Sequence, residues 1–208
     1  YAYYNGQEIM SDFEYDALFD ELQKLEKETG TTLPESPTSF KVGAAPVDGA
    51  VKVTHKYPAL SLAKTKSVDD LKSFLGEQKG YLSWKLDGLT LVATYIDGKL
   101  KNLVTRGNGL VGEDITRNAP YIRGVALNIP YKEEVVIRGE ALCSYPAFDN
   151  INARIENEED KYKNPRGVAS GSVRLLDAKE LEERDIHFIP FELVSPKANS
   201  VKEEKELI

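Results

Sequence analysis

Residues 81–105 read YLSWKLDGLTLVATYIDGKLKNLVT, and this stretch decides what kind of sheet the chain can form. Three segments in it, at 81–86, 89–96 and 99–105, are rich in the β-branched and aromatic residues that strands favour. Asp87-Gly88 and Asp97-Gly98 separate the segments, and an Asp-Gly pair between apolar runs is a strong signal for a two-residue hairpin. The stretch therefore predicts an antiparallel meander.

The rest of the chain mixes predicted helices with further predicted strands. Residues 11–29 have the periodicity of an amphipathic helix, and Ser67 with Asp70 has the spacing of a capped helix start. Pro146 opens another helical pattern, whereas 134–142 and 186–194 have the composition of strands. The Pro- and Gly-rich stretch 31–58 is interpreted as an extended linker. We therefore expect an α+β fold with mainly antiparallel sheets.

Composition excludes several classes of protein. With 208 residues, 41% of them hydrophobic and 29% charged, the chain is expected to be globular rather than disordered. It has no apolar run long enough to span a bilayer and no signal-peptide pattern, so we expect a cytoplasmic protein without membrane contact. The single Cys143 excludes an internal disulfide and a multi-cysteine zinc site. The formal charge of −7 argues against strong nonspecific DNA binding.

Lys85 is the first candidate for chemistry, because it stands at the predicted end of a strand, directly before the Asp87-Gly88 turn. An isolated K-x-D-G match is more often a solvated strand end than a reactive group. An amine attacks phosphorus only when it is neutral, and at a reference pKa of about 10.4 only roughly one lysine in a thousand is neutral at a pH of about 7.5. Partial burial and nearby cations would lower that pKa, and Arg106 and Arg138 are available in the sequence neighbourhood.

The glycines at 107–112 form a literal G-x-G-x-x-G after a predicted strand, which is the pattern of a dinucleotide-binding Rossmann turn. Glu133 and Glu134 stand where a ribose-binding acid could follow. However, Pro120 stops any helix within two turns, and hairpin-linked strands give no support for a parallel sheet. We therefore favour a flexible loop that brings Arg106 to a phosphate.

Two further segments carry arginines in unusual settings. Arg138 and Glu140 face the same side of an apolar strand, which is either a solvated face or the lining of a cleft. Arg166 and Arg174 would fall on nearly one face if 164–174 is helical, which suits a phosphate-bearing ligand. Close packing of the small residues between them, with solvent-facing arginines, is the alternative.

Taken together and in this order, the motifs strongly resemble the NAD-dependent, bacterial-type DNA ligases over essentially the whole chain. The resemblance extends to the segments 11–16, 35–38 and 42–43, and to His55 with the run 58–62. It implies a small helical module at residues 1–36, with its first helix incomplete, that clamps the nicotinamide mononucleotide (NMN) half of NAD. It further implies an ATP-grasp-like nucleotidyltransferase (adenylation) domain at 37–208, incomplete at its C-terminus.

The resemblance assigns roles to individual residues. Lys85 forms the adenylyl-lysine with Asp87 and Gly88 completing its motif, Glu140 contacts the ribose, and Phe191 lies near the adenine. The remaining implied sites are Ser61, Leu62 and Arg106 for the nucleotide; Tyr3, Tyr4, Asp12, Tyr15 and Asp16 for NMN; and Arg166 and Arg174 for DNA phosphates.

The activity that the resemblance implies is nick sealing by a DNA ligase. NAD adenylates the lysine, Mg²⁺ is the expected metal with no dedicated protein ligands, and nicked double-stranded DNA is the partner, bound weakly by these residues alone in a monomeric protein. Several positions depart from the usual family residues: Tyr4 replaces a His, Ser83 a Glu, Asn108 an Asp and Gly167 an Asn.

Two alternatives stay open beside this one. An ATP-dependent ligase or capping-type nucleotidyltransferase shares the lysine motif, but it has no NMN for the N-terminal tyrosines and acids to hold. The second alternative is a catalytically degenerate domain that binds nucleotide or DNA without reacting. The retained Lys85, Asp87 and Glu140 weigh against it.

Overall fold

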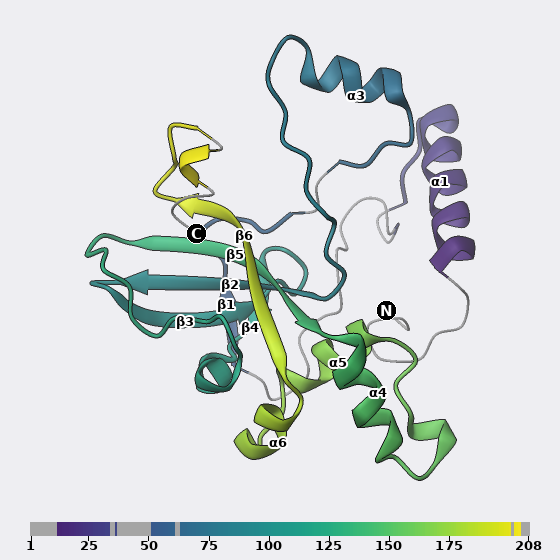
Figure 1. The fold of residues 1–208 in the computed structure, drawn as a ribbon. Coiled ribbons are helices and arrows are strands. Elements are labelled where there is room, and N and C mark those ends of the chain that lie inside the picture. The colour runs from purple at the N-terminus through teal and green to yellow at the C-terminus, as the bar shows by residue number, and fades with distance from the viewer. Residues whose placement is uncertain (1–11, 34–35, 37–50, 61–62, 201, 205–208) are drawn as a thin grey trace. The chain divides into compact units, whose positions relative to one another are not determined.

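The computed structural model describes residues 12–33, 36, 51–60, 63–200 and 202–204 (Figure 1). Contacts divide the chain into two compact units. Unit 1 comprises Tyr1–Leu60 with Arg106–Glu113, and unit 2 comprises Ser61–Thr105 with Asp114–Ile208. The chain thus enters unit 2, returns to unit 1 for the Gly-rich segment, and enters unit 2 again.

The described residues of unit 1 form one long helix and a two-stranded sheet. Helix α1 (Asp12–Thr29) ends before Gly30, whose φ of 64° is a left-handed conformation that glycine adopts at no steric cost. Strand β1 (Lys52–Thr54) pairs antiparallel with β4 (Val111–Glu113). The predicted helix is confirmed, whereas the stretch interpreted as an extended linker contains β1.

Unit 2 is built on a four-stranded sheet in the order β3-β2-β5-β6, and every pair in it is antiparallel. Its strands are β2 (Leu89–Ile96), β3 (Lys99–Thr105), β5 (Val135–Cys143) and β6 (Ile186–Ser195). Positive φ values of 50° at Asp97 and 75° at Gly98 form the predicted hairpin between β2 and β3. The antiparallel ladder rules out the Rossmann interpretation of this unit, which requires parallel strands.

Several short helices accompany the sheet in the described part of unit 2. These are α3 (Val68–Leu75), η2 (Thr116–Tyr121), α4 (Tyr145–Ala153), η3 (Glu158–Asp160), α5 (Pro165–Ser172) and α6 (Ala178–Glu183). As predicted, the Ser67 side chain accepts the Asp70 N–H at the start of α3, and Pro146 lies in the first turn of α4. Helices α4, α5 and α6 gather near the end of the sheet where β5 finishes and β6 begins (Figure 1).

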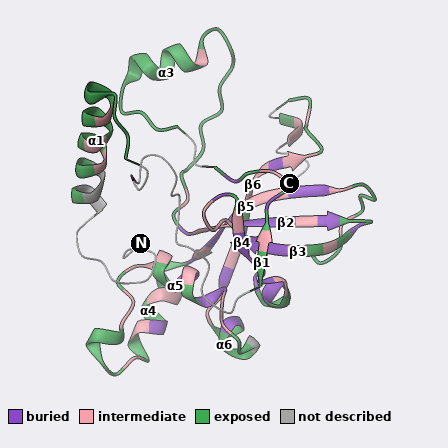
Figure 2. Ribbon diagram, turned by 180° about the vertical axis from the view of Figure 1, so that it is seen from behind, coloured by how far each residue is buried: buried purple, intermediate pink, exposed green. Residues whose placement is uncertain are grey.

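The hydrophobic core of unit 2 lies between the sheet and these helices. Leu91 and Leu103 from the hairpin, Ile186 from β6, Val168 from α5 and Leu181 from α6 are all fully buried. Figure 2 shows the buried residues concentrated along the strands of the sheet, and α4, α5 and α6 each add buried residues. Burying an aliphatic side chain of this kind stabilises the fold by roughly 1.5–3 kcal/mol. Helix α5 packs on the core through its fully buried Val168, Ala169 and Ser172.

The strand predicted at 81–86 is wrong. Residues 81–87 are irregular, and Tyr81, Leu82 and Trp84 are exposed. A strand requires a neighbour for its backbone hydrogen bonds, and β2, the strand that follows, is already paired on both sides by β3 and β5. The composition of residues 81–86 is typical of a strand, but β2 has no free edge with which these residues could pair.

The close approach of β5 to β6 generates a stability prediction at Gly139. A Cβ at this position would lie 2.4 Å from ring carbons of Phe188 and 2.7 Å from the Ile189 carbonyl oxygen. We expect Gly139→Ala to lower the free energy of unfolding by about 1–3 kcal/mol, as overpacking does in other cores. Urea unfolding measures the change.

The matched control is Gly171→Ala in α5. A Cβ there would meet only Tyr162, at an ordinary 3.6 Å or more, and alanine favours a helix over glycine by about 0.5–1 kcal/mol. Equal stabilities for Gly139→Ala and the wild type would contradict the packing described for this pair of strands.

Candidate functional site

A buried carboxylate on β5 forms the centre of the site in unit 2. Glu140 is only 9% exposed, and it lies opposite Thr90 in the register of β2 and β5. Its Oε1 accepts the backbone N–H of Gly88 at 3.1 Å, and its Oε2 accepts the Thr90 hydroxyl at 2.8 Å. Glu140 therefore lies in a hydrogen-bonded site, and the face of β5 that carries it is not freely solvated at this residue.

Gly88 allows the turn of the lysine motif to approach this carboxylate. A Cβ on Gly88 would lie 2.1 Å from the Ala141 carbonyl oxygen, a distance that no side chain can occupy. The glycine of the motif is therefore required by the contact of the turn with β5. The contact places the backbone N–H of Gly88 within hydrogen-bond distance of Glu140.

Lys85 lies in the segment that leads into this turn. Its side chain is exposed, so the expected partial burial is not observed. Its charge is nevertheless close enough to Glu140 to favour the ionised carboxylate. Lys85 and Glu140, to which the resemblance gives separate roles at the nucleotide, therefore lie near each other. The strand expected to hold the lysine is absent.

Burial governs the ionisation of Glu140. Desolvation raises the pKa of the Glu140 carboxyl above its ordinary value. The hydrogen bonds from Thr90 and Gly88 and the charges of Arg166 and Lys85 oppose that rise in pKa. These donors and cations favour the charged form but do not fully offset the effect of burial on the pKa. The charged form is the stronger acceptor for a hydroxyl of a ligand.

Helix α5 brings an arginine to the lysine motif. Arg166 Nη1 lies 2.7 Å from Asp87 Oδ1, across 79 residues of sequence. Asn164 accepts the Gly167 N–H and caps the helix, which fixes the first turn that carries Arg166. Arg166, expected to contact DNA, therefore lies beside the motif in this structure.

Arg174 does not share a helical face with Arg166, so that expectation is wrong. Helix α5 ends at Ser172, and Arg174 follows its C-cap at Val173. The Arg174 guanidinium turns back and donates to the Ser170 carbonyl oxygen at 2.6 Å and hydroxyl at 3.0 Å. The helix ends two residues before Arg174, and this difference is enough to change the direction of a long side chain.

Arg138 forms an ion pair on the same sheet. Its Nη1 lies 2.8 Å from Glu192 Oε2, and the Arg138 side chain is 14% exposed. The register of β5 and β6 shifts at this point. Arg138 faces Glu192 and Gly139 faces Pro190, so Phe191 is the extra residue of β6 between the two pairs. Phe191 is half-buried on β6, next to the acidic partner of Arg138.

The Gly-rich segment that carries Arg106 is held by its own contacts in unit 1. His55 is buried, and its Nε2 lies 3.1 Å from the Arg106 carbonyl oxygen. Asn108 Oδ1 accepts the N–H groups of Leu110 and Val111, which closes a tight turn into β4. The segment is therefore an ordered loop that leads into a strand. Sequence reasoning noted His55 but gave it no role in holding this loop.

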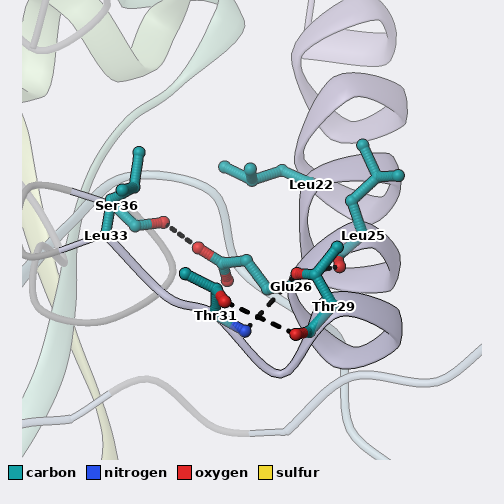
Figure 3. Close-up of a pocket in the computed structure, with 7 residues that line it drawn as sticks. All are labelled: Leu22, Leu25, Glu26, Thr29, Thr31, Leu33 and Ser36. Atoms are coloured by element: carbon teal, nitrogen blue, oxygen red, sulfur yellow. Dashed lines mark hydrogen bonds between the residues drawn. The ribbon is translucent and has the colours of Figure 1, made fainter.

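Unit 1 also contains an apolar cavity beside α1 (Figure 3). Its lining is Leu22, Leu25, Glu26, Thr29, Thr31, Leu33 and Ser36, and the Ser36 hydroxyl donates to the Glu26 carboxylate. Among these described lining residues Glu26 is the charged one, and it is acidic. The described lining therefore offers no cation for a phosphate.

Several predicted site residues lie outside the described residues. Tyr3, Tyr4, Ser61 and Leu62 belong to this group, and Asp12, Tyr15 and Asp16 lie in α1 with side chains that are not described. Within the described ranges, no three His, Cys, Asp or Glu side chains gather as metal ligands, and no helix is long and apolar enough to cross a membrane.

Family models match nearly the whole chain. The model described as "NAD-dependent DNA ligase adenylation domain" matches residues 49–207. The model described as "DNA ligase-like, N-terminal NAD+-binding domain" matches residues 1–43.

Curated relatives named DNA ligase agree with these matches. The protein of Ruminiclostridium cellulolyticum is 52% identical over 202 residues, which cover 97% of this chain and 30% of that protein. The protein of Lachnoclostridium phytofermentans is 50% identical over 188 residues, covering 90% and 29% of the two chains. That of Bacillus subtilis is 37% identical over 204 residues, covering 93% and 30%. The chain thus spans about 30% of the length of these relatives.

The raised pKa of Glu140 generates a prediction about pH. Because the folded-state pKa lies above the ordinary value of 4.5, the folded chain binds more protons than the unfolded chain between the two values. The contribution of this carboxyl to the free energy of unfolding therefore falls as pH rises through that window. We expect the unfolding free energy of the wild type minus that of Glu140→Gln to decrease as pH rises above 4.5. Urea unfolding at a series of pH values measures it, and a difference that increases with pH would refute the stated direction.

The Asp87–Arg166 ion pair generates a second prediction. The Asp87 side chain is 67% exposed and that of Arg166 is 24% exposed, so solvent weakens the attraction. A double-mutant cycle of Asp87→Asn with Arg166→Gln should give a coupling free energy of about 0.5–1 kcal/mol. The control pair is Asp97 with Lys132, 3.5 Å apart and more than 75% exposed on both sides, which should couple less. Equal coupling in the two pairs would contradict a specific link between α5 and the lysine motif.

Proposed function

The chain belongs to the NAD-dependent DNA ligases, and on that premise we propose that it forms the adenylation core of a nick-sealing enzyme with Lys85 as its nucleophile. The observation that carries the proposal is the arrangement around Gly88. The turn that follows Lys85 is hydrogen-bonded to the buried Glu140, and Arg166 is paired with Asp87 of the same motif. One nucleotide bound at this turn would meet an amine, a guanidinium and a hydroxyl-accepting carboxylate.

In the first step, the neutral Lys85 amine attacks the α-phosphorus of NAD. A bond forms between Nζ and phosphorus, the bond from phosphorus to the NMN oxygen breaks, and NMN leaves with that electron pair while Nζ loses its proton to solvent. Catalysis of phosphoryl transfer rests mainly on position and on opposite charge. Arg166 is the described guanidinium close to the motif, so it is placed to offset charge on the phosphoryl oxygens.

Glu140 would accept a ribose hydroxyl of the adenylate. The proposal also assigns Phe191 to the adenine, Arg106 with Ser61 and Leu62 to the nucleotide, and Tyr3, Tyr4, Asp12, Tyr15 and Asp16 to NMN. After adenylation, AMP passes to a DNA 5′-phosphate, and the adjacent 3′-hydroxyl attacks it to seal the nick. Arg166 and Arg174 would then contact DNA phosphates, Arg166 by exchanging Asp87 for an oxygen of the backbone.

Magnesium is the metal that we propose for this chemistry. Mg²⁺ favours phosphate oxygens and retained waters over a full set of protein ligands, and the site fits that preference. Glu140 is engaged by the Gly88 and Thr90 donors and Asp87 is paired with Arg166, so the ion would be held by the nucleotide phosphates and by water, without a dedicated protein ligand. Bound there, the ion would supply positive charge to the phosphates.

The remaining parts of the proposal concern the protein as a whole. We assign residues 1–36 to the NMN-binding module and 37–208 to an ATP-grasp-like nucleotidyltransferase domain. The protein acts as a monomer in the cytoplasm, on nicked double-stranded DNA. The family model described as an N-terminal NAD+-binding domain supports the assignment of the NMN-binding module.

A degenerate domain that binds without reacting is the second candidate, and the exposure of Lys85 favours it. A reactive amine is commonly shielded from water, because desolvation lowers its pKa. The two candidates differ in one observable, which is covalent adenylate on Lys85.

The test uses the full-length protein and radiolabelled NAD. We expect NAD to label the wild type and ATP to leave it unlabelled, and Lys85→Ala to reduce labelling by at least about 10³-fold, as loss of a nucleophile does. Lys79→Ala, at an exposed lysine of the same segment, is the matched control and should label normally. Mass spectrometry should locate the adenylate on Lys85.

Three results would count against the proposal. Label from ATP alone would indicate an ATP-dependent nucleotidyltransferase. An unlabelled wild type in complete protein would favour the degenerate domain. Undiminished labelling of Lys85→Ala would place the nucleophile elsewhere.

A further inference from the structure

Thr90 is the residue of the site to which no role has yet been given. It lies on β2, two residues after Gly88 and directly opposite Glu140 in the β2–β5 register. Its hydroxyl donates to Glu140 Oε2 at 2.8 Å, while the Gly88 N–H binds the other oxygen at 3.1 Å. The two donors come from the same short stretch, one from the backbone and one from a side chain.

Two donors on different oxygens fix the plane of the carboxylate. A single hydrogen bond would leave the Glu140 carboxyl free to rotate about its terminal torsion, which is a soft one. Threonine is suited to this task because its branched Cβ restricts χ1, so the hydroxyl is held in place by the strand. A carboxylate can accept about four hydrogen bonds, so acceptor positions on Glu140 are still available to a ligand.

We propose that Thr90 is a positioning residue that acts through Glu140, orienting the carboxylate to accept a hydroxyl of the adenosine ribose. The inference rests on the proposed function, because it requires an adenylate at this site. Thr90 itself does not touch the ribose. Its effect on the reaction is therefore expected in the binding of NAD rather than in the transfer step.

The charges around Glu140 support this role. Burial raises the pKa of the Glu140 carboxyl, and the Thr90 hydroxyl is the first of the groups that oppose that rise, followed by the Gly88 N–H. Arg166 from α5 and Lys85 from the segment before β2 are the charged groups that act on it. Removing the hydroxyl should therefore raise the pKa of Glu140 further and protonate it at a higher pH.

Substitution at Thr90 separates positioning from a purely structural role. Thr90→Val keeps the shape of the side chain and removes the donor, and Thr90→Ser keeps the donor. In single-turnover adenylation of the full-length protein, we expect Thr90→Val to raise the NAD concentration at half-maximal rate by roughly 10-fold, the cost of one hydrogen bond to a charged group. The maximal rate should stay within about 2-fold of the wild type, because ground state and transition state use the ribose contact alike.

Two further signatures are expected in the same assay. Thr90→Ser should restore most of the NAD binding, and the acidic limb of the pH profile should move to higher pH in Thr90→Val. Thr94→Val, at a half-buried threonine four residues further along β2, is the matched control and should leave the NAD dependence unchanged.

Deoxyribose analogues of NAD decide whether the effect passes through the ribose. The penalty of Thr90→Val should disappear with whichever adenosine 2′-deoxy or 3′-deoxy analogue lacks the hydroxyl that Glu140 accepts. An equal penalty with both analogues and NAD, or a Thr90→Val variant that matches the wild type with NAD, would overturn the inference alone. A wild type that takes no label from NAD would overturn the proposed function and this inference with it. Thermal unfolding of each variant shows whether a loss is one of folding, and a stable, impaired Thr90→Ser would also contradict the proposal.

Discussion

The hydrogen bond from the Gly88 N–H to the Glu140 carboxylate is the interaction on which the site depends. It joins the turn of the lysine motif to the central strand β5, across 52 residues of sequence. The antiparallel ladder of β2 and β5 sets the register that makes this bond possible, and the missing side chain of Gly88 permits the approach. Sheet topology, a glycine and a buried acid therefore act as one constraint on where the segment before β2 can lie.

The balance of charge around that bond explains what the site can bind. Each acidic group near the motif has a partner: Asp87 binds Arg166, and Glu140 binds Thr90 and Gly88. Lys85 adds positive charge at an exposed position. An incoming phosphate therefore meets the positive charges of Arg166 and Lys85, while the carboxylates of the site are already engaged by donors. This arrangement limits repulsion and suits a phosphate-bearing substrate. Rigidity comes from α5, whose small residues pack against the sheet and fix Arg166.

Local signals in the sequence were sufficient for most elements of unit 2. The β2–β3 hairpin follows from Asp97-Gly98, and the strands β5 and β6 follow from their composition, because each of these patterns is contained in a few consecutive residues. Pairing between distant segments was not predictable in the same way. The short β1–β4 pair depends on contacts across more than 50 residues, and the 81–86 strand was overpredicted because composition does not reveal whether a neighbouring edge is free. Residue roles show the same division: the Lys85 motif was visible in sequence, whereas the Thr90 and Arg166 contacts required the fold.

A crystal structure of the full-length protein with NAD bound, determined with Lys85→Met to prevent reaction, tests the central claim most directly. The account predicts adenosine at the Gly88 turn, with a ribose hydroxyl within hydrogen-bond distance of the Glu140 carboxylate and the α-phosphate on the side from which residue 85 approaches. Density for the nucleotide at any other place, with Glu140 contacting no part of it, would contradict the account.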